Sequence, residues 1–368
     1  MVKLSERVNE RDLDAQFQAA LRALIARVPF LTLRPLKRDV QLGTGRIGRP
    51  DWLAELRAGD QSWTLVAEEG KSGQPRDVRS AVLQLKDYLS LLPPDRPACG
   101  LVLAPFISEE SARICKEAGI GYADLAGNAR LSFDRIFIEV RSAEKPRVVK
   151  REARSIFSPK ATRVLRVLLQ GPLRAWKVKE LAAAAEVSLG HVSAVRQKLL
   201  EREWAAEEDG GLRVTKADAL LDAWVAADDW SRRTEVREYS LLEGEAAQIA
   251  SRVHGFLGTG RHAFTQWFGA FLRRPYALPV VTTVYVSEFP TDEALKEKLG
   301  ARRVDSGGGG LRLVRPKDEG VFNGARDLNG LPVVSDIQLY LDLQRAGLRG
   351  DEAAEKLRKA PDFTGGWT

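Results

Sequence analysis

The sequence predicts a multi-domain α/β protein, and three observations support that fold class. The chain has 368 residues, more than one hydrophobic core usually serves, so two or three domains are expected. Strand-like apolar runs alternate with amphipathic helical segments. Basic residues are concentrated in one stretch near the middle of the chain. The expected parts are an α/β domain (1–144), a basic linker (145–157), a helical DNA-reading segment (158–228) and a second α/β domain (229–368).

The composition excludes several classes of protein. Hydrophobic residues make up 44% of the chain and charged residues 29%, and no apolar run approaches the roughly 18–20 residues of a membrane helix. The N-terminus lacks the apolar core of a signal peptide. Two cysteines and three histidines are too few for a disulfide framework or a zinc-finger array. A cytoplasmic protein without a membrane partner is therefore expected.

Helices and strands alternate in the N-terminal domain. The helix expected at 12–28 carries Leu13, Phe17 and Leu21 on one apolar stripe. Gly127 and Asn128 favour a tight turn between two closing strands, because both residue types tolerate a positive φ. The other expected elements are strands at 63–69 and 100–105 and helices at 77–92 and 109–118.

Three short motifs in this domain point to metal-assisted chemistry. Asp51 closes a Gly48-x-x-Asp51 pattern, Glu69 and Lys71 end a strand, and Gln84 and Tyr88 lie on the next helix. Because side chains two apart on a strand share a face, Glu69 and Lys71 are expected to point the same way. Asp51 and Glu69 could then hold Mg²⁺ through carboxylate oxygens, and Lys71 could orient the attacking water.

In this order the motifs resemble those of PD-(D/E)xK nucleases, in particular the RecB-like branch. The resemblance implies a restriction-endonuclease-like α/β domain. If the domain is active, its catalytic residues are Asp51, Glu69, Lys71, Gln84 and Tyr88. The family usually has apolar residues where this chain has Glu68 and Gly70. Glu68 adds a second negative charge and Gly70 weakens the strand, so a domain that keeps the fold as a contact platform is the alternative.

The positive charge of the chain is confined to its middle. Residues 145–215 contain 15 lysines and arginines against eight acidic residues, a net charge of +7 that equals that of the whole chain. Such a local excess is the electrostatic footprint of phosphate binding. A solvated linker is the alternative explanation.

The same stretch has the pattern of a winged helix-turn-helix. Ser158 and Pro159 begin a helix that ends before Gly171, and a short second helix is expected over 177–185. Ser188 caps a third helix over 189–201, and Asp209-Gly210-Gly211 favours a hairpin. The third helix is expected to enter the major groove while the hairpin, or wing, touches the DNA backbone.

The exposed side of the third helix supplies the groove candidates, and the flanking cations supply the phosphate contacts. No cofactor is required for this binding, and a homodimer is expected because such proteins commonly read paired half-sites. The groove candidates are His191, Ser193, Arg196 and Lys198. The phosphate candidates are Lys160, Arg163, Lys177 and Lys179.

The C-terminal region combines strands with helices. A strand is expected at 236–242, a helix at 245–257 and a β-branched strand at 278–287. In the run VVSDIQLYLDLQRAGLRGDEAAEKLR, which begins at Val333, apolar residues fit a helix that packs on the preceding strands. The polar side of this helix, with Asp336, Gln338 and Asp342, is expected to be available to a partner.

This run, with TTVYVS before it and VFNG, resembles the C-terminal part of AbiEi-type antitoxins, the autoregulators of type IV toxin–antitoxin systems. The resemblance covers residues 158–368, and its most specific part is Gln338-Leu-Tyr-Leu-Asp342. It implies a transcriptional regulator whose winged helix binds operator repeats in double-stranded DNA. It also implies a nucleotidyltransferase-like toxin as a partner. The extra RecB-like domain departs from minimal members of the family.

The sequence is therefore compatible with three functions. The first is the DNA-binding regulator. The second is a magnesium-dependent DNA endonuclease that its winged helix brings to the target. The third is a protein-contact adaptor that neither cleaves DNA nor binds an operator.

Overall fold

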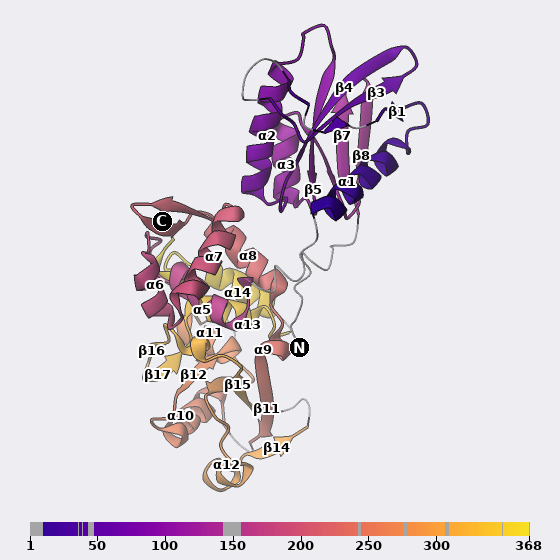
Figure 1. Ribbon diagram of the computed structural model, residues 1–368. Coiled ribbons are helices and arrows are strands. Elements are labelled where there is room, and N and C mark those ends of the chain that lie inside the picture. Colours follow the sequence, from indigo (N-terminus) through magenta and orange to yellow (C-terminus); the bar gives the residue numbers. More distant parts are fainter. Residues whose placement is uncertain are drawn as a thin grey trace, which may run out of the picture. The chain divides into compact units, whose positions relative to one another are not determined.

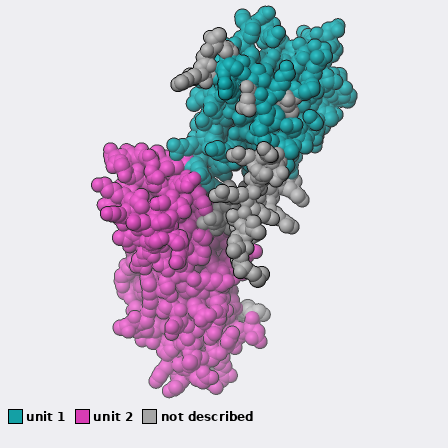
Figure 2. Space-filling model, viewed as in Figure 1, with its two compact units in different colours: residues 1–152, 201–203 teal, residues 153–200, 204–368 magenta. Residues whose placement is uncertain are grey.

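The computed structural model describes residues 10–35, 37–38, 40–42, 48–142, 156–241, 244–275, 278–305, 309–347 and 349–367. These residues form a mixed α/β structure, as the sequence predicts (Figure 1). The chain divides into two compact units, one of residues 1–152 with 201–203, the other of residues 153–200 with 204–368 (Figure 2). Among the described helices, none is long and apolar enough to cross a membrane.

The first unit is built on one mixed sheet. Its strand order is β1-β3-β4-β5-β6-β7-β8, with β2 paired to β3, and the β4–β5 and β5–β6 pairs are parallel. The strands are β1 (Thr32–Leu33), β2 (Lys37–Arg38), β3 (Trp52–Ala58), β4 (Gln61–Glu69), β5 (Ala98–Ala104), β6 (Gly121–Asp124), β7 (Ala129–Phe133) and β8 (Ile136–Val140). The helices are α1 (Glu10–Ile25), α2 (Pro75–Ser90) and α3 (Glu109–Glu117).

Two apolar layers cover opposite faces of this sheet. On β4, Leu65 and Ala67 belong to the layer that contains Phe17 of α1. Val66 belongs to the other layer, which contains Val78 of α2. The alternation follows from the pleat of an extended strand, in which successive side chains point to opposite faces. By the same alternation, Glu68 and Glu69 at the end of β4 point to opposite faces of the sheet.

The turn expected at Gly127 and Asn128 is confirmed. Gly127 has a φ of +91°, and the Asp124 carboxylate accepts hydrogen bonds from the backbone N–H groups of Asn128 (2.8 Å) and Ile107 (2.9 Å). Asp124 is 2% exposed. Its role is to hold the turn between β6 and β7.

The second unit begins with three helices and a hairpin, at the positions that the sequence predicts. The helices are α5 (Pro159–Leu169), α6 (Val178–Ala185) and α7 (Leu189–Glu201), and the hairpin strands are β9 (Ala205–Glu208) and β10 (Gly211–Val214). Leu212 also exchanges backbone hydrogen bonds of 2.9 Å with Trp176, which precedes α6. Gly211 allows this approach, because a Cβ there would lie 3.0 Å from the backbone of Trp176.

A seven-stranded sheet forms the rest of the second unit. Its order is β14-β11-β15-β13-β12-β17-β16, and the β13–β15 and β12–β17 pairs are parallel. The strands are β11 (Thr234–Ser240), β12 (His262–Thr265), β13 (Thr282–Val286), β14 (Arg302–Val304), β15 (Leu311–Pro316), β16 (Arg326–Leu328) and β17 (Leu331–Val333). The helices are α8 (Ala217–Ala227), α9 (Trp230–Arg233), α10 (Ala246–Leu257), α11 (Gln266–Arg273), α12 (Asp292–Leu299), α13 (Asp336–Leu343) and α14 (Gly350–Arg358), with short 3-10 turns η1 (Glu319–Phe322) and η2 (Phe363–Gly365).

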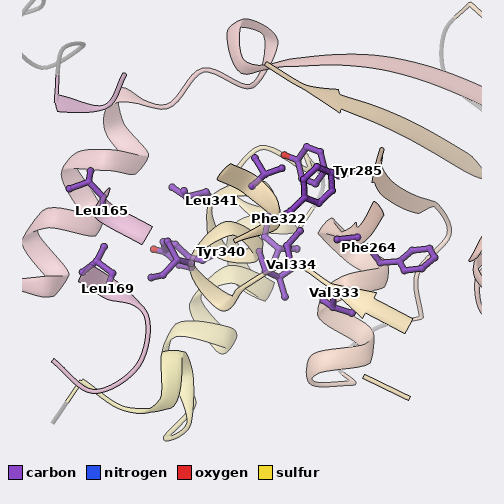
Figure 3. Packing of buried hydrophobic residues seen from close by; sticks show 14 of the residues in the cluster. Leu165, Leu169, Phe264, Tyr285, Phe322, Val333, Val334, Tyr340 and Leu341 are labelled. Atoms are coloured by element: carbon purple, nitrogen blue, oxygen red, sulfur yellow. The ribbon is translucent and has the colours of Figure 1, made fainter. Parts of the chain in front are cut away.

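One continuous core joins the three-helix segment to the C-terminal sheet. Leu165 and Leu169 of α5 lie in the same apolar cluster as Tyr340 and Leu341 of α13 (Figure 3). Every residue of α13 is buried. The helix expected in this run is therefore present, but the expectation that its polar side is available to a partner is wrong.

Candidate nucleic-acid interface

The local sequence around Ser188 sets the start of α7. Glu186 ends α6 in the left-handed region, with φ +53°, and Ser188 follows before the new helix. The Ser188 hydroxyl lies 2.8 Å from His191 Nδ1. Val192 and Val195 face the core, which leaves His191 and Ser193 exposed. An exposed polar helix face preceded by a tight turn is the arrangement that the sequence predicts here.

Arg196 is paired with the hairpin. Its guanidinium forms an ion pair with Glu207 of β9, and the two side chains are 36% and 56% exposed. Glu208, the next residue, pairs with Arg213 at 3.0 Å. With Asp209, three consecutive acidic residues occupy this hairpin. The sequence predicts that this hairpin contacts the DNA backbone. Because carboxylates repel phosphates, the acidic residues of the hairpin disfavour that contact.

The lysines predicted to bind phosphate lie near helix starts. Lys160 is exposed in the first turn of α5. Lys177 precedes α6 as its N-cap residue and Lys179 lies in its first turn, both exposed. The N-terminus of a helix carries a partial positive charge that adds to such cations. Lys198, in the last turn of α7, is half-buried.

Arg163 has a different environment. Its guanidinium contacts Asp318 at 2.8 Å and Glu186 at 3.6 Å, and its side chain is 18% exposed. The hydrogen bond to Asp318 raises the pKa of Arg163. The residue thus ties α5 to the turn before η1.

The positive charge of the middle stretch is shared between two segments. Residues 145–155 carry five of its 15 basic residues and one of its acidic residues. Most of the predicted basic linker (145–157), namely residues 145–155, lies outside the described residues. The part at 156–215 has ten basic and seven acidic residues. The described surface is therefore less basic than the count for the whole stretch suggests.

The nuclease-like motifs of the first unit meet at the ends of β3 and β4. Trp52 is paired with Ala67, so Asp51 lies across from Glu68. The Asp51 N–H donates to Glu68 Oε1 (3.2 Å), and the Glu69 N–H donates to Asp51 Oδ2 (2.8 Å). Side chains that lie opposite each other on paired strands share a face. The structure thus brings Asp51 together with Glu68, the residue at which this chain departs from the usual motif.

Glu69 points to the other face. Its Oε1 accepts a hydrogen bond from the Trp52 indole and lies 3.7 Å from the Arg38 guanidinium. Burial raises the pKa of Glu69. Burial and the charge of Asp51 raise the pKa of Glu68 to about 7. The charge of Asp51 also raises the pKa of Glu69, so the two carboxylates still act on each other. Among the described residues there is no group of three or more His, Cys, Asp or Glu able to hold a metal ion.

The remaining motif residues differ in their surroundings. Lys71 lies beyond the end of β4 and is exposed, and Gln84 is exposed on α2. Tyr88 is buried, and its hydroxyl donates to the Arg49 carbonyl at 3.4 Å. Burial and the charge of Glu68 raise the pKa of Tyr88.

A buried polar network, absent from the sequence prediction, joins α5 to α13. Arg166 donates to Gln338 Oε1 from Nε (3.0 Å) and Nη2 (2.6 Å), and Gln338 donates to Asp342 at 2.7 Å. Asp342 also accepts from Arg233 (2.8 Å) and Thr265 (2.5 Å). Burial lowers the pKa of Arg166 to about 10 and raises that of Asp342.

A second buried carboxylate lies at the start of α13. Asp336 contacts Arg273 (2.9 Å) and Arg326 (2.8 Å), and it accepts a hydrogen bond from the Thr364 N–H (2.8 Å). The side chain of Asp336 is 1% exposed. Gln338, Asp342 and Asp336 therefore join α13 to neighbouring elements of the second unit, among them α5, α11 and β16.

No protein-family model matches the chain, and none of the curated proteins compared with it is significantly similar.

Proposed function

We propose that the chain is a DNA-binding transcriptional regulator, with α5–α7 and the β9–β10 hairpin acting as a winged helix-turn-helix. The observation that carries the proposal is the exposed polar side of α7, directly after the Ser188 turn and with Lys177 and Lys179 at the start of α6. An α-helix fits the major groove of B-DNA, where every base pair presents a distinct pattern of donors and acceptors.

Base reading and phosphate binding are assigned to different residues in this proposal. His191, Ser193 and Arg196 lie on the exposed part of α7 and read base edges. Arg196 is suited to guanine, whose O6 and N7 accept two hydrogen bonds from a guanidinium. Phosphate binding falls to Lys160, Lys177 and Lys179, because the wing carries the acidic residues 207–209.

The resemblance of residues 158–368 to AbiEi-type antitoxins supports a regulatory role. Under the same proposal, the partners are double-stranded DNA, a nucleotidyltransferase-like toxin and a second copy of the chain. The compartment is the cytoplasm. DNA cleavage is no part of this function, because Asp51 is partnered with Glu68 whereas the Glu69 carboxylate accepts a hydrogen bond from the Trp52 indole.

Titration of labelled DNA from the protein's own promoter against random DNA, at two salt concentrations, tests the proposal. Lys177→Ala is expected to weaken binding to both DNAs alike and to reduce the slope of log affinity against log salt by about one. Arg196→Ala is expected to reduce the preference for the promoter by about tenfold. Lys296→Ala, which removes an exposed lysine of α12, is the matched control.

Two results would count against this function. One is equal affinity of the wild type for promoter and random DNA. The other is promoter binding that neither Lys177→Ala nor Arg196→Ala changes beyond the effect of Lys296→Ala.

A further inference from the structure

The pairing of Arg196 with the wing suggests how base reading is controlled. Arg196 lies on the proposed recognition helix α7, and Glu207 lies on β9, the first strand of the wing. Their ion pair joins these elements, and both side chains are partly exposed. The contact therefore lies at the surface that meets DNA under the proposed function, on which this inference rests.

We infer that Glu207 is a specificity-determining residue that positions the Arg196 guanidinium for base reading. A guanidinium has five N–H donors in a planar fork. The Glu207 carboxylate contacts Arg196 Nη2, which leaves donors on the other edges for a base. A long, flexible arginine loses side-chain entropy when it is fixed on a base, and a carboxylate that already holds it reduces that loss.

Glu207 also disfavours incorrect DNA. Its carboxylate repels phosphates, so it weakens every complex in which Arg196 gains no base contact in return. When Arg196 binds guanine O6 and N7, the cytosine of the same base pair presents an N4 donor, which a carboxylate accepts. The pair therefore favours a G·C base pair at the position that Arg196 reads.

The neighbouring residue Glu208 provides a matched control. It lies on the same strand and carries the same charge, but it pairs with Arg213 of β10 instead of a residue of α7. General repulsion of phosphates predicts the same effect for Glu207→Ala and Glu208→Ala. Positioning of Arg196 predicts a loss of base discrimination only for Glu207→Ala.

The test measures the affinity of the full-length variants for the promoter site, for sites with one changed base pair and for random DNA. Both Glu207→Ala and Glu208→Ala are expected to raise the affinity for random DNA several-fold. Only Glu207→Ala is expected to reduce discrimination at one base-pair position, by about tenfold. In an Arg196→Ala background, Glu207→Ala is expected to leave discrimination unchanged.

The possible results separate the inference from the proposed function. Equal discrimination by Glu207→Ala and Glu208→Ala, with promoter preference intact in the wild type, would overturn the role of Glu207 alone. A wild type that does not prefer its promoter would overturn both. Thermal unfolding of the variants shows whether a change in discrimination comes from a loss of folded protein, and an unchanged midpoint together with lost discrimination supports the positioning role.

Discussion

Replacing Gln338 by methionine is expected to destabilise the second unit strongly, although the two side chains have similar volumes. Gln338 is fully buried and accepts both hydrogen bonds that Arg166 makes to it. Arg166 is 4% exposed, and its Nη1 has no hydrogen-bond partner among the described residues. The Gln338→Met variant would leave this buried cation without an acceptor.

The magnitude follows from the cost of an unpaired buried charge. Removal of the acceptor from a buried, hydrogen-bonded cation costs about 3 kcal/mol. Gln338→Met also removes the 2.7 Å hydrogen bond to Asp342, but that carboxylate keeps Arg233 and Thr265. For a unit of about 200 residues, the loss corresponds to a fall in the melting temperature of about 10 °C.

A double-mutant cycle distinguishes the loss of pairing from the loss of packing. The double variant Arg166→Met with Gln338→Met removes the charge and its acceptor together, so it is expected to recover about 2–3 kcal/mol of the loss. Calorimetry of the full chain would follow the unfolding of the second unit, with the transition of the first unit as an internal reference.

Two results would refute this reasoning. A loss below about 1 kcal/mol in Gln338→Met would mean that Arg166 finds another acceptor. Additive effects of the two substitutions would mean that the contact contributes no coupling energy.

Three further predictions concern other parts of the molecule. Gly73→Ala is expected to destabilise the first unit by about 2 kcal/mol more than Gly59→Ala in thermal unfolding, because a Cβ at Gly73 would lie 2.0 Å from the Phe106 carbonyl oxygen whereas Gly59 faces open space at a similar φ; equal effects would contradict this. Burial and His254 lower the pKa of His262, so the unfolded state binds the proton first and the second unit should lose stability as the pH falls below about 6.5. Melting at pH 7.5 and 5.5 should show a smaller difference for His262→Gln than for the wild type. Plasmid incubated with Mg²⁺ or Mn²⁺ should give the same products with the wild type and Lys71→Ala, and cleavage by the wild type alone would show that this edge is an active nuclease site.

Local sequence signals predicted the three helices and the hairpin at the start of the second unit well. Pro159, Ser188 and Asp209-Gly210-Gly211 mark boundaries by their own backbone preferences, so no distant contact is needed to place them. The start of α11 has no such signal. Gln266 there has a φ of +50°, and its side chain accepts a hydrogen bond from Thr283 (3.0 Å). A tertiary contact thus accompanies this boundary, and such contacts are not visible in a local pattern.

The spacing of residues in the sequence predicted only part of the candidate site in the first unit. The two-residue spacing of Glu69 and Lys71 suggested one shared face, but it did not establish which face Asp51 occupies. The burial of Leu65, Val66 and Ala67 on alternating faces contained the missing information. Side chains two apart on a strand share a face, so Glu68 lies on the face of Val66 and Glu69 lies on the face of Ala67. Counting along the strand from its buried residues would have placed Glu68 and Glu69 on opposite faces, whereas the partner of Asp51 depends on the register of β3 against β4.

The polar residues of α13 could not be interpreted from the sequence, because Arg166 lies 172 positions away from Gln338. In the structure, the cations Arg166 and Arg233 balance the carboxylates Asp228 and Asp342. A buried network of this kind adds little stability compared with apolar residues of the same size, so stability alone does not explain it. We expect that it fixes the orientation of α5 on the C-terminal sheet. Since α5 packs against α6, the C-terminal part of the unit would then, under the proposed function, determine how α7 is presented to DNA without contacting the DNA itself.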